Sequence, residues 1–556
     1  MRNALIRSVL TYVFAAMTLS TTASAQTQDS LWIRYDDRFT PNRRLLSLAG
    51  CDSMEFRASR TAPVVRCYTP SQARGYFDYY LTSIIAKQPG TLMFRNPGRI
   101  VYKPSEFSSM DFMDDESKWS FKRSKESEHF IVFWEKGFGD NPQSGKVPSG
   151  LRVDIDDLLA KAERFYTTNV ETLGLVETGS GRSQLDRYKM EIYLLYQTDW
   201  LATGSGYDDK VGALWVNPST CQPVGSTIGH EIGHSFQYQT YCDNVLRGRA
   251  NDHKTGFRYG LPGSNGGNGF WEQCAQWQSF QDYPDEALTT WHFAYWKANH
   301  HRHFENEWQR YASYWLHYYL TDRSGMTTIG RLWNESAYPE DALMAYTRLF
   351  CDGDYATTRR LLFDYAQRCV TFDFKAVRSK VTNQYDTYTT SLLDDGNGWL
   401  QVTYANCPAP TGFNAVPLTV PQAGTKVTAR VEGLPVGSSL LASDPGIQID
   451  GNGKCVDTVA VYNTTDMKGN EGWACGFVAL KSGGERVYGD ACFISATDGD
   501  GSLTGEVAFT VPENTLRLWL VVQGSPTVYR FSPWDDREST DDQLPYRLQL
   551  DGTSVK

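Results

Sequence analysis

The chain has 556 residues, a formal net charge of −10 and 13% aromatic residues, with 16 Trp and 32 Tyr. This length predicts about three domains. The mildly acidic charge and the absence of basic runs argue against nucleic acid as a partner. The aromatic content is typical both of carbohydrate-handling proteins and of large β-rich cores.

Residues 1–25 have the pattern of a secretory signal peptide. Arg2 and Arg7 precede a mostly apolar stretch from Ser8 to Ser20, and Ala23-Ser24-Ala25 forms an A-x-A cleavage site. The apolar stretch is too short to span a bilayer comfortably, and no later stretch is apolar enough. We expect a secreted or periplasmic protein, cleaved after Ala25, with no transmembrane segment. The oligomeric state is not indicated.

Export permits disulfides among the eleven cysteines. Cys51–Cys67 and Cys351–Cys369 are plausible local pairs, although connectivity cannot be derived from the sequence. The absence of a C-x-x-C pair argues against a cysteine-based zinc site.

Residues 26–120 show little periodicity and predict a small N-terminal region. A second domain, 121–400, is expected to be α+β and to contain an active-site helix. Its first half alternates strand and helix patterns, with a turn or loop expected over 204–209. The expected strands are 127–134, 190–196 and 211–216, and the expected helix is 153–174.

Helices are predicted for the second half of this domain. A loop is expected over 251–269, and helices over 269–280, 285–322 and 340–395. The cluster His300-His301-Arg302-His303 is expected on a solvent-exposed face.

Residues 405–556 predict an all-β sandwich, since short alternating segments are separated by Gly, Pro and Asp turns. The expected strands are 427–431, 459–462, 475–480, 516–522 and 546–550. The acidic run 498–506 superficially resembles a calcium loop, but Leu503 and Phe509 occupy positions that such a loop gives to Gly and Glu. We expect a turn there.

The strongest motif is His230-Glu231-Ile232-Gly233-His234, an H-E-x-x-H. On a helix, residues i and i+4 lie on one face, so both imidazoles can bind one metal ion, and Glu231 can act as a general base on water. Val224, Ile228, Ile232 and Phe236 form an apolar stripe that would bury the helix. Gly229 and Gly233 suggest that another backbone or the substrate passes close by.

A catalytic zinc ion requires a third protein ligand. Glu272 is the best candidate because the predicted helix 269–280 carries it on one edge with Ala275 and Gln276, where the small Ala275 allows two helices to approach closely. The other candidates are Asp243, His253, Asp282 and Glu286. For stabilisation of the oxyanion, Tyr311 is the first choice and His317 the second, and each is also compatible with a place in the core.

His230, Glu231 and His234 together with Glu272 resemble the gluzincin metallopeptidases, and the run to Gln237 is similar to the H-E-x-G-H-x-x-Q of enhancin-like, mucin-targeting gluzincins. The stretches 212–218 and 271–277 resemble a family of secreted bacterial proteins of unknown function. The resemblance covers roughly residues 125–390. It implies a zincin-like fold, zinc on His230, His234 and Glu272, and Glu231 as base, and the choice of Tyr311 borrows from gluzincins.

The main hypothesis is a secreted zinc endopeptidase that hydrolyses peptide bonds of proteins or glycoproteins. The alternative is a catalytically inactive zincin-like protein that binds glycans or a surface. A zinc hydrolase that acts on non-peptide bonds is the third possibility.

Overall fold

The computed structural model describes residues 99–249, 257, 267–450, 452–464, 467–499, 502–532, 534–535 and 537–556. Before residue 99 it gives only the bounds of seven strands: β1 (Ser30–Asp36), β2 (Pro41–Ser47), β3 (Ser53–Arg57), β4 (Val64–Tyr68), β5 (Tyr76–Tyr80), β6 (Ile84–Gln88) and β7 (Thr91–Phe94). The expected signal peptide lies outside the described residues. The chain forms two compact units, one of residues 1–166 and 177–224, the other of 167–176 and 225–556. A separate domain over 121–400 stays a prediction.

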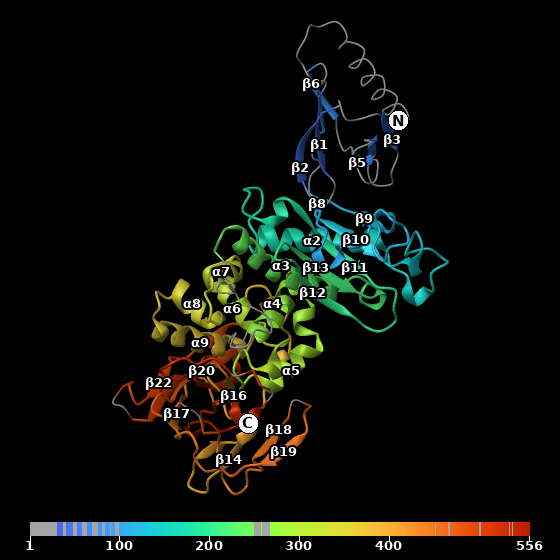
Figure 1. Ribbon diagram of the computed structural model, residues 1–556. Coiled ribbons are helices and arrows are strands. Elements are labelled where there is room, and N and C mark those ends of the chain that lie inside the picture. The colour runs from blue at the N-terminus through green and yellow to red at the C-terminus, as the bar shows by residue number, and fades with distance from the viewer. Residues whose placement is uncertain are drawn as a thin grey trace. The chain divides into compact units, whose positions relative to one another are not determined.

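The first unit contains a mixed sheet of order β12-β13-β11-β10-β9, with β8 (Ile100–Val101) paired to β11 (Figure 1). The strands are β9 (Ser124–Glu126), β10 (Phe130–Trp134), β11 (Tyr188–Leu194), β12 (Ala202–Tyr207) and β13 (Val211–Val216). β10, β11 and β13 run parallel, and helix α2 (Ile155–Thr167) connects the first two. Every residue of β10 and β11 is buried, as expected for parallel strands covered on both faces.

The expected turn over 204–209 is wrong in its extent. Ala202–Tyr207 is a strand that pairs antiparallel with β13 along its whole length, and the turn is confined to the residues after it. Asp208 and Asp209 both have φ of +53°, the backbone of a tight hairpin turn. The weak strand preference of Gly204 and Gly206 is outweighed by pairing with a buried neighbour.

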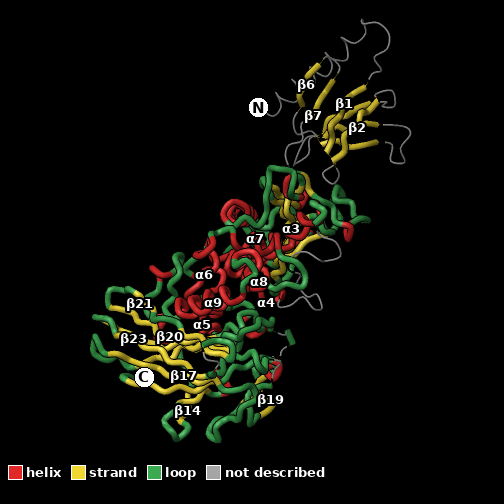
Figure 2. The backbone as a smooth tube through the Cα atoms, turned by 90° about the vertical axis from the view of Figure 1, so that its left-hand side faces the viewer, coloured by secondary structure: helices red, strands yellow, loops and turns green. Residues whose placement is uncertain are grey.

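Helices dominate the first half of the second unit (Figure 2). They are α3 (Ser226–Leu246), α4 (Gly267–Asp282), α5 (Trp291–Asn299), α6 (Trp315–Ser324), α7 (Thr328–Glu335), α8 (Ala342–Phe350) and α9 (Tyr355–Cys369). The helical prediction for 340–395 is wrong after Cys369. The chain turns at Phe372, whose φ is +49°, and the ring of Phe372 packs 4.8 Å from that of Trp315.

Two antiparallel sheets form the C-terminal part of this unit. One has the order β14-β15-β25-β17-β23 and the other β16-β24-β20-β21, with β22 paired to β20. Val427 from the first sheet and Trp473, Phe477 and Leu520 from the second belong to one buried core, so the sheets form a sandwich. The bounds are β14 (Leu392–Asp394), β15 (Leu400–Val402), β16 (Phe413–Leu418), β17 (Lys426–Gly433), β20 (Gly472–Lys481), β21 (Arg486–Tyr488), β22 (Cys492–Ser495), β23 (Thr504–Thr510), β24 (Thr515–Gly524) and β25 (Tyr546–Asp551).

The fold is therefore α+β with a strand-rich C-terminal part, as the sequence predicts.

The expected strand over 459–462 is wrong, because the separate hairpin of β18 (Ile447–Ile449) and β19 (Cys455–Thr458) ends before it. The expected turn at Asp498 fits the structure, and the Asp498 carboxylate forms an ion pair with Arg359 at 3.0 Å.

None of the helices in the described residues has the length and apolar character that crossing a membrane requires.

The predicted Cys351–Cys369 disulfide is wrong, since nine cysteines of the described residues are free thiols. Cys351 precedes α9 and Cys369 ends it, and a helix of 15 residues separates its ends by about 22 Å. A disulfide requires Cα atoms within about 7 Å. Cys51, of the other expected pair, lies outside the described residues.

The histidines at 300, 301 and 303 are buried, which corrects the expected solvent-exposed face. The start of the sandwich covers them. Ala409 N donates to His301 O at 2.8 Å and Phe413 N donates to His300 O at 3.1 Å. Burial lowers the pKa of His300 to about 4 and that of His303 to about 3, so both are neutral at pH 7.

Candidate metal centre

Helix α3 presents the H-E-x-x-H motif from a fully packed position. Ile228, Ile232 and Phe236 are buried as predicted, while Val224 precedes the helix, which begins at Ser226. His230 and His234 are also buried, and their Nε2 atoms lie 3.0 Å apart. Both imidazoles therefore point to the same place, one helical turn apart.

Helix α4 brings Glu272 to these imidazoles. Glu272 Oε2 lies 3.2 Å from His230 Nε2 and 3.1 Å from His234 Nε2, and all three side chains are buried. Two imidazole nitrogens and one carboxylate oxygen, all within 4.8 Å of one another, form a group that could hold a metal ion. Ligands at 2.0–2.1 Å from a tetrahedral ion would be separated by about 3.3 Å, so the observed triangle fits such an ion after a small expansion.

The other candidates for a third ligand are engaged elsewhere. Asp243 accepts a hydrogen bond from Gln239, Asp282 from Thr168, and Glu286 from Ser226. His253 lies outside the described residues. Among the described candidates, only Glu272 joins the histidine pair.

The electrostatics of the group favour a bound positive charge. Burial lowers the pKa of His234, but the carboxylate of Glu272, followed by that of Glu231, outweighs burial and raises it to about 9. Burial raises the pKa of Glu272, but the two imidazoles outweigh this effect and hold it well below its usual range. The group could therefore hold either a proton or a metal ion.

Glutamine side chains orient both imidazoles. His230 Nδ1 donates to Gln276 Oε1 at 2.7 Å, and His234 Nδ1 donates to Gln237 Oε1 at 2.9 Å. Gln237 Nε2 in turn donates to Gln278 Oε1 at 2.8 Å. Because these contacts hold a proton on each Nδ1, each imidazole in its neutral form presents the lone pair of Nε2, the atom that a metal ion would bind.

Tyr311 and His292 lie beside His230. The ring centroid of Tyr311 lies 5.9 Å from that of His230 and 5.6 Å from that of His292. Gln276 Nε2 donates to His292 Nδ1 at 3.1 Å, which leaves the His292 proton on Nε2. Burial and then the nearby His230 lower the pKa of His292 to about 4, so it is a neutral hydrogen-bond donor at pH 7.

The structure separates the two choices for the oxyanion role. Tyr311 lies beside the ligands, whereas His317 is in the core, stacked on Phe270 at 4.9 Å and on Trp277 at 5.7 Å. Neither ring nitrogen of His317 has a hydrogen-bond partner, and burial lowers its pKa to about 3. His317 thus behaves as an aromatic core residue.

Comparison with known families gives a match over most of the chain. Residues 94–556 match the family described as "Family of unknown function (DUF6055)". The chain belongs to the DUF6055 family. The match includes both histidines, Glu231 and Glu272 of this DUF6055 chain, and the sandwich as well. The comparison with curated proteins found no match. Membership of DUF6055 assigns no reaction, so the resemblance to gluzincins stays a proposal.

Sequence reasoning missed two features of the site. It assigned no role to His292, and it gave Gln237 no role beyond a family pattern. Gln237 is three residues from His234, a spacing that places the two side chains on one helix face, so this contact could have been found. No spacing signal distinguishes His292 from the four other histidines at 300, 301, 303 and 317.

Proposed function

We propose that this chain is a zinc-dependent endopeptidase that hydrolyses peptide bonds of proteins or glycoproteins. The observation that carries the proposal is the convergence of His230, His234 and Glu272, with ligand atoms 3.0–3.2 Å apart, next to the buried carboxylate of Glu231. Two imidazoles and one carboxylate are the ligand set of known zinc peptidases. A structural zinc site would use a fourth protein ligand, and none is found among the described residues.

The residues divide the chemistry between them. Zinc, when bound, would supply a Lewis acid that lowers the pKa of water to about 7. Glu231 accepts the proton from the attacking water and delivers it to the leaving amine. The neutral His292 Nε2–H and the Tyr311 hydroxyl donate to the oxyanion that develops on the carbonyl oxygen. Gln276 serves this arrangement twice, since its oxygen orients His230 and its nitrogen orients His292.

The proposal is tested by cleavage of unfolded proteins and glycoproteins. The purified full chain should cleave them, lose activity with a chelator and regain it with added zinc. Glu231→Gln keeps the shape of the side chain and removes the base, so turnover should fall by roughly 10²–10⁴-fold. A Glu231→Gln variant as active as the wild type would contradict the mechanism.

The same assay addresses the alternatives. A chain that binds zinc and glycans but cleaves no protein or glycoprotein would favour the inactive glycan-binding hypothesis. Zinc-dependent hydrolysis of esters or amides without any peptide cleavage would favour the non-peptide hydrolase.

A further inference from the structure

Arg310 holds a positive charge close to the metal centre. Its guanidinium carbon lies 5.5 Å from the ring centre of Tyr311, whose ring is 5.9 Å from that of the ligand His230. On the sandwich side, the same guanidinium lies 5.7 Å from the ring centre of Trp534. The Arg310 guanidinium therefore lies over one aromatic ring beside His230 and over one from the C-terminal part.

This charge has no acidic partner among the described residues. The neighbouring Arg302 forms ion pairs with Glu538 at 3.1 Å and with Asp541 at 3.4 Å, whereas no residue that the structure describes forms an ion pair or a side-chain hydrogen bond with Arg310. A cation–π contact engages the charge of the guanidinium and none of its N–H donors. Those donors match a carboxylate, which accepts two parallel hydrogen bonds.

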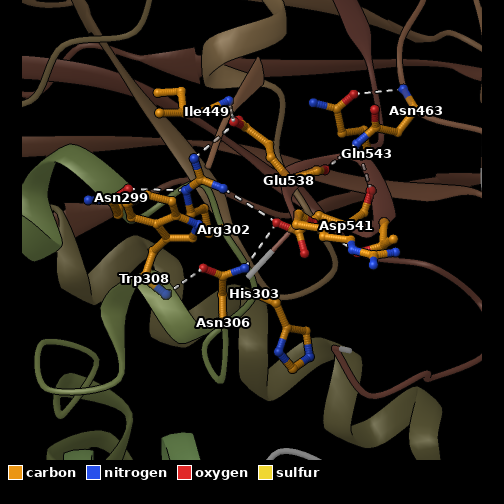
Figure 3. A network of polar contacts seen from close by, with 12 residues as sticks. Asn299, Arg302, His303, Asn306, Trp308, Ile449, Asn463, Glu538, Asp541 and Gln543 are labelled. Carbon is orange, nitrogen blue, oxygen red and sulfur yellow. Dashed lines mark hydrogen bonds and ion pairs between the residues drawn. The ribbon is translucent and has the colours of Figure 1, made fainter. Parts of the chain in front are cut away.

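Glu538 and Asp541, which follow Trp534 in the chain, are held in a network of polar contacts (Figure 3). Besides the two ion pairs of Arg302, Asn306 Nδ2 donates to Asp541 at 3.0 Å, and Asn463 Nδ2 donates to the backbone oxygen of Glu538 at 2.7 Å. Glu538, Asp541, Asn306 and Asn463 are all buried. This network joins Arg302 and Asn306, which precede Arg310, to Glu538 and Asp541, which follow Trp534, so these two parts of the chain are held together before a ligand arrives. Such preorganisation reduces the entropy lost on binding.

We propose that Arg310 binds a carboxylate of the substrate beside the reacting bond, and that the C-terminal part thereby contributes Trp534 to substrate selection. The inference rests on the proposed function, because it assumes that the reacting bond lies at the metal centre. The carboxylate can be an Asp or Glu side chain, the C-terminus of a peptide or the acid group of a sialylated glycan. All three offer the same planar anion.

The test uses matched pairs of peptide hydroxamates, whose hydroxamate group binds zinc. One pair carries Glu or Gln next to the hydroxamate, a second has a free or amidated C-terminus, and a third bears a sialylated or asialo glycan. Calorimetry measures their binding to the zinc-loaded full chain. In at least one pair the acid should bind roughly 10-fold tighter or more, since charge-assisted hydrogen bonds are the stronger ones. The pair that shows the preference identifies the source of the carboxylate.

Arg310→Met should abolish that preference and leave binding of the neutral member unchanged. Lys297→Met removes one positive charge from nearby helix α5, where Lys297 lies over Phe293, and should leave the preference intact. Thermal unfolding of Arg310→Met separates a stabilising role of the ring contacts from ligand binding. Equal binding of acid and neutral members in all three pairs, with hydroxamates still bound, overturns this inference and leaves the proposed function standing. Failure of the wild type to take up zinc overturns both.

Discussion

Gly233 of α3 faces Ala275 of α4 at the point where the helices that carry His230, His234 and Glu272 approach each other. A Cβ atom added at Gly233 would lie 3.3 Å from Ala275 Cα and 3.2 Å from Gln278 Oε1. The sequence predicts a close approach at each residue separately, and the structure shows that the two meet. This contact sets how near Glu272 comes to the histidines.

Gly233→Val should therefore weaken both the fold and metal binding. The larger side chain has to push α4 away, and overpacking of this kind lowers the free energy of unfolding by about 1–3 kcal/mol. Urea unfolding and zinc competition titrations measure the two effects. Gly145→Val is the control, because a Cβ at Gly145 meets no atom within 4 Å. Unchanged zinc affinity in Gly233→Val would show that α4 does not depend on this contact.

Gln237→Leu and Gln276→Leu should each lower zinc affinity by roughly 10–100-fold, because partners of ligand histidines fix the ring and its tautomer. Competition with a fluorescent chelator measures this affinity. Gln281→Leu is a matched control on α4, since Gln281 donates only to the backbone oxygen of Trp277. Wild-type affinity in both test variants would remove the orienting role of the glutamines.

His292→Asn and Tyr311→Phe should each reduce kcat by roughly 10²–10³-fold with little change in KM or zinc content, as expected when one oxyanion donor is lost. Steady-state kinetics on a cleaved substrate, with metal analysis of the same samples, checks this result. His317→Phe should retain activity because His317 lies in the core. Loss of zinc from His292→Asn would instead assign His292 to metal binding.

His317 should also make the protein less stable in acid. Burial lowers its pKa to about 3, below the value of about 6.5 expected in the unfolded chain, so between these values the unfolded state binds more protons. Stability from this group is complete above pH 6.5 and is lost as the pH falls toward 3.

Urea unfolding at pH 7.5 and pH 5 tests this relation. His317→Phe keeps the aromatic stack and removes the proton site, so it should lose less stability over this interval than the wild type, by on the order of 2 kcal/mol. An equal loss in both proteins would show that His317 is not buried as a neutral ring.

The sequence was sufficient for those features that local spacing determines. The i, i+4 spacing predicts a helix that brings His230 and His234 together, and the Glu272, Ala275 and Gln276 edge of α4 contacts that helix as its spacing suggests. Strand β13 has the predicted bounds, Val211–Val216. These features could be derived because each depends on periodicity within one element.

Features that depend on distant parts of the chain could not be derived in this way. His300 and His301 are buried because residues 409 and 413 of the sandwich bond to their backbone, and nothing near them in the sequence indicates that cover. Ala202–Tyr207 is a strand because β13 pairs with it, despite its glycines. His292 reaches the site only through the packing of α5 beside Tyr311.

The zinc content of three purified proteins, the wild type, Glu231→Gln and Glu272→Gln, tests the central claim most directly. Reconstituted with zinc and dialysed, the wild type and Glu231→Gln should each retain about one zinc per chain, because Glu231 is the base and not a ligand. Glu272→Gln should retain much less, because it weakens a ligand. No zinc in the wild type, or full zinc in Glu272→Gln, would contradict the assignment of His230, His234 and Glu272 as the metal centre.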